Sequence, residues 1–99
     1  MTMSELKKMI AEDKPTLVDF FATWCGPCKM QSPILEQLKQ QVGDTANIIK
    51  IDVDRNPDLA AEYQIRSVPT IMVFRNGVQQ WRASGLQQLE VLASQLKAD

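Results

Sequence analysis

The stretch TLVDFFATWCGPC, residues 16–28, contains both cysteines of this 99-residue chain and joins two kinds of secondary structure. Residues 16–22 are almost continuously apolar, which is typical of a β-strand that is buried on both faces. From residue 26 onward the apolar residues recur with helical spacing. The stretch therefore predicts a strand followed by a helix, with Cys25 and Cys28 at the turn between them.

The spacing of the two cysteines points to thiol chemistry. Two thiols separated by two residues can close into a small disulfide ring and open again, so Cys25 and Cys28 can cycle between dithiol and disulfide. A helix start offers unpaired backbone N–H groups and the positive end of the helix dipole to the first sulfur. This environment favours a thiolate at Cys25, and the thiolate is the form that attacks disulfides.

Three other interpretations of the cysteine pair are weaker. A structural disulfide that closes so small a ring constrains little of the unfolded chain. A zinc site needs about four ligands, and a chain with two cysteines and no histidine would have to share the metal between copies. Inert buried thiols would leave the position at a helix start unexplained. We therefore favour redox catalysis, expect no metal, and exclude a Cys-His protease because histidine is missing.

Length and composition indicate one soluble globular domain over residues 1–99. The chain is 44% hydrophobic and 23% charged, with a net charge of −1, and it has no basic stripe that would indicate nucleic-acid binding. Charged residues interrupt the apolar ones throughout residues 1–13, so this segment does not have the pattern of a signal peptide. No apolar run approaches the length of a membrane span. We expect a cytoplasmic protein that contacts neither nucleic acid nor membrane.

The remaining sequence predicts an alternation of helices and strands. Thr2 and Glu5 have the spacing of a capping box, and Asn76-Gly77 is a strong hairpin signal. The predicted elements are a helix over 3–12, a strand over 16–22, a helix over 26–42 with Met30, Ile34, Leu38 and Val42 on its apolar face, a strand over 48–53, a helix from N-cap Asn56 and Pro57 to about Tyr63, strands over 70–74 and 78–83, and a helix over 86–97. This order predicts an α/β fold with a four-stranded mixed sheet and helices on both faces.

Trp24-Cys-Gly-Pro-Cys28 resembles the active site of the thioredoxin family, and the resemblance spans roughly residues 15–85. It includes Val18 to Thr23, Lys29-Met30, Ser32-Pro33, Ile51 to Pro57, Ile65 to Thr70 and Phe74 to Gly77. The resemblance implies a thioredoxin fold that lacks the usual N-terminal strand. The strand over 48–53 would then be an exposed sheet edge, which is a surface for pairing.

The resemblance also implies catalytic roles. Cys25 would be the nucleophile and Cys28 the resolving thiol. By composition alone, Asp19 would turn to a wet end of its strand, because a lone buried carboxylate is costly. The resemblance instead implies that Asp19 is buried behind Cys28 and exchanges its proton, with Lys50 modulating it; otherwise Lys50 is a surface lysine.

A substrate groove follows from the same resemblance. Pro69 would have a cis peptide bond and face the nucleophile, which lets the backbone of Val68 pair with a substrate chain. Trp24 would flank the groove, although it could be a core aromatic, and Gly85 would be either a turn or the groove floor. The predicted substrate-binding residues are Trp24, Gly26, Pro27, Ser67, Val68, Pro69 and Gly85. Ser67 and Ser84 depart from the family pattern, which leaves partner choice open.

The residues between the cysteines indicate the direction of the reaction. No histidine precedes the second cysteine to stabilise the thiolate, so the pair is predicted to be a reductant. The implied partners are proteins with disulfides and a thioredoxin reductase that uses NADPH. We expect the chain to be a monomer and to need no cofactor beyond the reversible Cys25–Cys28 disulfide. Two alternatives remain: an oxidoreductase of an oxidising compartment, and a binding module that does not turn over.

Overall fold

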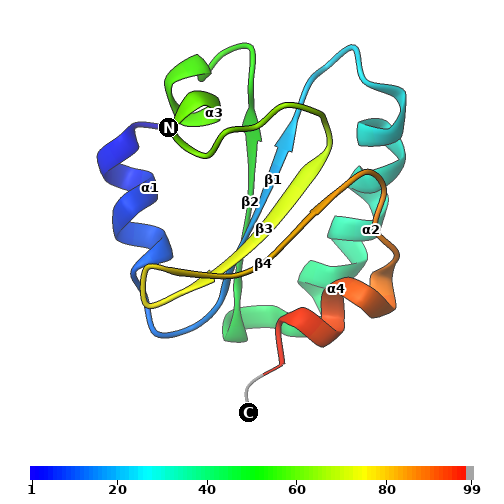
Figure 1. Ribbon diagram of the computed structural model, residues 1–99. Coiled ribbons are helices and arrows are strands. Elements are labelled where there is room, and N and C mark those ends of the chain that lie inside the picture. Colours follow the sequence, from blue (N-terminus) through cyan, green and yellow to red (C-terminus); the bar gives the residue numbers. More distant parts are fainter. Residues whose placement is uncertain (98–99) are drawn as a thin grey trace.

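The computed structural model describes residues 1–97, in which helices and strands follow the predicted order (Figure 1). The elements are α1 (Met3–Ile10), β1 (Thr16–Phe21), α2 (Gly26–Val42), the 3₁₀ turn η1 (Gly43–Thr45), β2 (Asn47–Asp52), α3 (Pro57–Glu62), β3 (Thr70–Arg75), β4 (Val78–Ser84) and α4 (Leu89–Gln95). Among these helices, none is long and apolar enough to cross a membrane.

The four strands form one mixed sheet in the order β2-β1-β3-β4. β1 runs parallel to β2 and antiparallel to β3, and β3 runs antiparallel to β4. Helices α1 and α3 lie on one side of the sheet, and α2 and α4 lie on the other (Figure 1). The predicted α/β architecture, with helices on both faces of a four-stranded sheet, is confirmed.

Strand β1 is buried on both faces, as its continuous apolar sequence predicts. Alternate side chains of a strand point to opposite faces, so Val18 and Phe20 join the core with Leu6 of α1, while Leu17 joins the core with Leu35 of α2. Burial on both faces fixes β1 at the centre of the molecule. The carboxyl end of β1, which leads to Cys25, is therefore rigidly placed.

Strand β2 forms one edge of the sheet, in agreement with the exposed edge expected from the sequence. The N–H groups of Asn47 and Val53 donate to Pro15 and Phe21 at 2.9 Å each. Because backbone direction alternates along a strand, the N–H and C=O groups of Ile48 and Lys50 point away from β1. Pairing of another chain with this edge stays a prediction.

Helix α1 ends at Ile10, two residues before the predicted end. The carbonyl oxygens of Ile10 and Glu12 accept hydrogen bonds at 2.9 Å from Gly77 and Asn76, which form the β3–β4 turn. The turn itself has φ angles of 54° and 78° at Asn76 and Gly77, as the hairpin signal predicts. A contact between distant segments thus decides where α1 stops.

The start of α1 is a capping box, and it gives a stability prediction. Glu5 N–H donates to Thr2 Oγ1 at 3.1 Å, and Thr2 N–H donates to Glu5 Oε1 at 2.7 Å. The backbone hydrogen bond from Thr2 holds the pKa of Glu5 below its ordinary value. We expect Thr2→Ala to lower the free energy of unfolding by about 1 kcal/mol in urea titrations. Ser4→Ala, an exposed control on the same helix, should lose nothing, and equal values for both variants would contradict a capping role.

The predicted apolar face of α2 is wrong at Met30 only, because Leu38 is buried and Ile34 and Val42 pack against the core. The buried residues of the helix are Cys28, Gln31, Leu35 and Leu38, whereas Met30 is 61% exposed. Residues spaced by four advance about 40° around a helix at each step, so a stripe that is buried at Leu38 reaches solvent at Met30. The buried residues of α2 alternate spacings of three and four. The sequence does not show them as an apolar stripe, because one of them is the polar Gln31.

Two further details of the helices differ from the sequence predictions. Helix α4 begins at Leu89 rather than at residue 86, because the backbone of Gln87 is hydrogen-bonded to the side chain of Gln31. Asn56 is the N-cap of α3, but its side chain makes no capping bond and donates to Asp52 O at 3.0 Å instead. Both differences come from bonds to residues outside the helix concerned.

Candidate active site

Cys25 and Cys28 lie at the junction of β1 and α2, where the sequence places them. They form a disulfide with their Cα atoms 5.3 Å apart. Cys25 is the N-cap of α2, and its Sγ accepts a hydrogen bond from the N–H of Cys28 at 3.2 Å. The sulfur thus occupies the place of a capping oxygen, and this N–H would stabilise a thiolate there. Pro27, in the first turn, has no N–H that needs a partner.

The segment before β3 faces the first cysteine. The peptide bond between Val68 and Pro69 is cis, as the resemblance implies, and the carbonyl oxygen of Val68 lies 3.5 Å from Cys25 Sγ. Among the described residues, neither the N–H nor the C=O of Val68 takes part in a backbone hydrogen bond. An extended peptide could therefore pair with Val68 directly beside the sulfur. We call Ser67, Val68 and Pro69 the ledge.

Trp24 flanks a shallow groove rather than filling the core. Its side chain is 70% exposed, and its indole N–H donates to Asp54 Oδ2 at 2.9 Å. The groove has a volume of about 170 Å³ and is lined by Trp24, Val53, Ile65, Arg66, Ser67 and Val68. The sequence does not single out Asp54, because no spacing pattern indicates that a residue 30 positions away contacts Trp24.

Gly85 connects the end of β4 to the ledge. Its φ of 86° is the left-handed conformation that favours glycine, and its N–H donates to Pro69 O at 2.8 Å. Thr70 Oγ1 donates to Ser67 O at 2.7 Å and lies 3.3 Å from Ser84 Oγ. Gly85 is thus a turn residue that also supports the ledge, and the two serines that depart from the family pattern are joined through Thr70.

Asp19 is fully buried in the middle of β1, with 0% exposure, so the interpretation that it turns to a wet strand end is wrong. Neither of its carboxyl oxygens has a hydrogen-bond partner among the described residues. Burial raises the pKa of Asp19 to about 6, and the positive charge of Lys50 opposes this rise. An unpartnered carboxyl that titrates near neutrality is suited to exchange protons.

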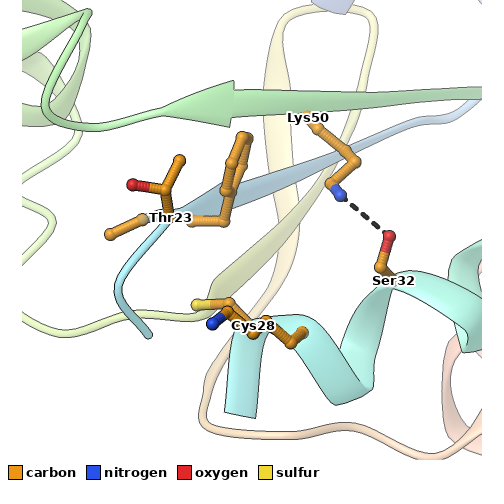
Figure 2. A pocket seen from close by; sticks show the side chains of 7 residues that line it. Thr23, Cys28, Ser32 and Lys50 are labelled. Carbon is orange, nitrogen blue, oxygen red and sulfur yellow. Dashed lines mark hydrogen bonds between the residues drawn. The ribbon is translucent and has the colours of Figure 1, made fainter. Parts of the chain in front are cut away.

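Lys50 is held against α2. It is the register partner of Asp19 on β2, its Nζ donates to Ser32 Oγ at 3.0 Å, and it lies 4.8 Å from the ring centroid of Phe21. Figure 2 shows Lys50 and Ser32 meeting at a hollow that Cys28 also lines. The hollow has a volume of about 320 Å³. The structure therefore gathers the second cysteine, an ammonium group and a hydroxyl around one hollow.

Within residues 1–97, no three His, Cys, Asp or Glu side chains gather where they could hold a metal ion. Most of the predicted site residues fall into two groups. Cys25 Sγ lies beside the ledge, to which Gly85 bonds and with which Trp24 lines a groove, while Cys28 and Lys50 line the hollow. Asp19 lines neither the groove nor the hollow and is the register neighbour of Lys50. The sequence did not reveal Gln31, Ser32, Asp54 or Thr70, each of which bonds to a segment distant in the chain.

Comparison with known proteins identifies this arrangement. The thioredoxin family model matches residues 1–98. The chain is 47% identical to thioredoxin of Rickettsia felis over 89 residues, which cover 89% of this chain and 85% of that protein. It is 50% identical to thioredoxin of Staphylococcus aureus over 80 residues, covering 81% and 77%.

Solved structures give the same result. A mutant thioredoxin from Halobacterium salinarum superimposes with a TM-score of 0.87 at 38% identity, covering 97% of this chain and 83% of that one. Thioredoxin from Fasciola hepatica gives a TM-score of 0.87 at 33% identity, covering 95% and 93%. The chain belongs to the thioredoxin family and is a thiol–disulfide oxidoreductase that acts through the dithiol of Cys25 and Cys28.

Proposed function

We propose that Cys25 is the nucleophile and that the chain reduces protein disulfides. The thiolate of Cys25 attacks one sulfur of a substrate disulfide, forming a mixed disulfide and releasing the other sulfur as a thiolate. The observation that carries this assignment is the position of Cys25 Sγ, which is capped by Cys28 N–H and adjacent to Val68, whose backbone makes no backbone–backbone hydrogen bond among the described residues. At this position the sulfur lies next to an N–H that would stabilise its thiolate and next to the backbone with which an extended substrate would pair.

Cys28 then completes the exchange. Its thiol loses a proton, and the resulting thiolate attacks Cys25 Sγ, which forms the Cys25–Cys28 disulfide and expels the second substrate thiolate. Two electrons have then passed from the dithiol to the substrate. We assign Asp19 as the base that accepts this proton, because its carboxyl is buried, has no hydrogen-bond partner among the described residues and titrates near pH 6. Lys50 modulates it, since its charge lowers the pKa of Asp19.

The substrate groove consists of Trp24, the first turn of α2 and the ledge. Gly26 and Pro27 lie in the first turn of α2, and an added Cβ at Gly26 would meet no atom within 4 Å, so this surface is open to a partner. Trp24 offers an exposed aromatic wall, and Val68 offers backbone groups for an extended chain. The N–H of Gly85 donates a hydrogen bond to Pro69 O and so stabilises the ledge. This surface suits an extended peptide segment on either side of a cystine.

Further assignments concern the direction, the compartment and the partners of the reaction. The pair lacks a histidine before Cys28, which leaves the reduced form less stabilised and makes the dithiol a reductant. A reductant of this kind suits a reducing compartment such as the cytoplasm. The recharging partner is a thioredoxin reductase supplied with NADPH, and the chain works as a monomer without a cofactor other than its disulfide.

The test is the reduction of insulin disulfides with NADPH and a bacterial thioredoxin reductase. We expect NADPH oxidation to depend on both the protein and the reductase, because the dithiol must be regenerated at each cycle. A reduction potential measured against glutathione buffers should lie well below the range of disulfide oxidases. A potential within the oxidase range would refute the proposed direction, and turnover that does not require the reductase would refute the proposed partner.

A further inference from the structure

Gln31 is a fully buried polar side chain on α2, with 0% exposure. It lies on the helix face that also contains Cys28 and the apolar residues Leu35 and Leu38. A buried primary amide is costly unless its oxygen and nitrogen are both hydrogen-bonded. The hydrogen-bond partners of Gln31 therefore show which segment of the chain is bound to this otherwise apolar face.

Both partners belong to a single residue, Gln87, in the segment between β4 and α4. Gln31 Nε2 donates to Gln87 O at 3.0 Å, and Gln87 N–H donates to Gln31 Oε1 at 2.8 Å. The two bonds pair one side-chain amide with the backbone of one residue, as strands pair in a sheet. In Figure 1 the segment between β4 and α4 crosses to α2, and these bonds fix it there.

The same segment supports the ledge. The side chain of Gln87 donates to Ser84 O at 3.3 Å and to Gly85 O at 3.2 Å. Gly85 N–H in turn donates to Pro69 O at 2.8 Å. A continuous series of hydrogen bonds thus leads from α2, which carries both sulfurs at its start, to Pro69 in the ledge.

We propose that Gln31 is a positioning residue that sets the distance and orientation of the ledge relative to the two cysteines. It does not touch the reacting sulfurs, and its bonds hold Gln87, Gly85 and Pro69 in series. The inference rests on the proposed role of the ledge in binding an extended substrate. Loss of Gln31 should weaken the docking of a protein disulfide and leave the intrinsic attack of Cys25 unchanged.

Gln31→Met tests this role because methionine has a similar volume and can make neither bond. With insulin and a saturating reductase, we expect KM to rise about tenfold while kcat stays within about twofold, since two hydrogen bonds to the backbone are lost. The rate with 5,5′-dithiobis(2-nitrobenzoic acid), a small disulfide that has no chain to dock, should equal the wild-type rate. Hydrogen exchange of the Gly85 N–H should accelerate. Gln37→Met, on the exposed side of α2, is the matched control.

Gln87→Ala keeps the folded backbone and removes only the bonds to Ser84 and Gly85, so it tests the next link if Gln31→Met folds poorly. We expect a KM increase of about threefold with the small-disulfide rate again unchanged. An unchanged KM for insulin in both variants overturns the proposal, as does an equal loss with insulin and with the small disulfide. Failure of the wild-type protein to reduce insulin would instead reject the proposed function.

Discussion

Replacing Cys25 by serine abolishes the reduction of insulin, down to the uncatalysed background. A serine hydroxyl is not ionised near neutral pH, and an oxygen in this place cannot form the mixed disulfide through which two electrons reach the substrate. The fold should tolerate the change, because serine is a favoured N-cap residue and can accept the bond from Cys28 N–H. The measurement is NADPH oxidation with insulin and reductase, with near-ultraviolet circular dichroism as the check of folding.

Replacing Cys28 by serine has a different outcome and is the matched control. Cys25 can still attack, but the mixed disulfide cannot be resolved, so a covalent complex with the substrate should accumulate and dissociate when dithiothreitol is added. If Cys28→Ser forms no such complex and Cys25→Ser does, the roles of the two cysteines are reversed. Undiminished partner binding by the double variant, combined with no turnover by the wild type, would identify a binding module instead.

The sequence predicts the order of elements because each has a strong local signal. The apolar run of β1, the capping box at Thr2 and the Asn76-Gly77 turn are all decided by neighbouring residues, and all are confirmed. The position of Cys25 and Cys28 at the start of α2 follows from the same signals. A buried strand that turns directly into a helix leaves few other places for the two sulfurs.

The parts that the sequence did not predict depend on contacts between distant segments. Helix α1 stops where the β3–β4 turn bonds to its last carbonyls, and α4 starts late because Gln31 holds Gln87. The sequence does not place Gln31 on the buried face of α2, because its side chain is polar and its partner lies in another segment. The burial of Asp19 follows from both faces of β1 being covered, and it agrees with the resemblance rather than with composition alone.

Replacing Asp19 by asparagine stabilises the oxidised protein at pH 7 by about 3 kcal/mol. The folded-state pKa of Asp19 is about 6 against an ordinary value of 3.8, and each pKa unit corresponds to about 1.4 kcal/mol. Because the folded-state pKa is raised, its favourable contribution is complete below pH 3.8 and is lost as the pH rises through about 6. The side chain of asparagine does not ionise, so the variant does not lose stability over this pH range. Urea unfolding should show a difference in the free energy of unfolding that is large at pH 7 and vanishes below pH 3.8.

The same substitution slows the second half of the reaction. An ordinary thiol with a pKa of about 8.5 is only a few per cent ionised at pH 7, so a base that accepts the proton during the attack can accelerate that attack by at most about 30-fold. We expect Asp19→Asn to resolve a preformed mixed disulfide up to about 30-fold more slowly at about pH 7, with the difference narrowing above about pH 8.5. The wild-type rate should rise through about pH 6, where Asp19 ionises.

Two measurements separate the proton-accepting role of Asp19 from a merely structural one. Asp13→Asn removes an exposed carboxylate and should change neither the resolution rate nor the free energy of unfolding. A variant of Asp19 that gains stability yet resolves the mixed disulfide at the wild-type rate across the pH range would show that the carboxyl is buried without accepting the proton of Cys28. The gain in stability together with the slower resolution would mean that the fold keeps a costly buried carboxyl because resolution of the mixed disulfide needs a base.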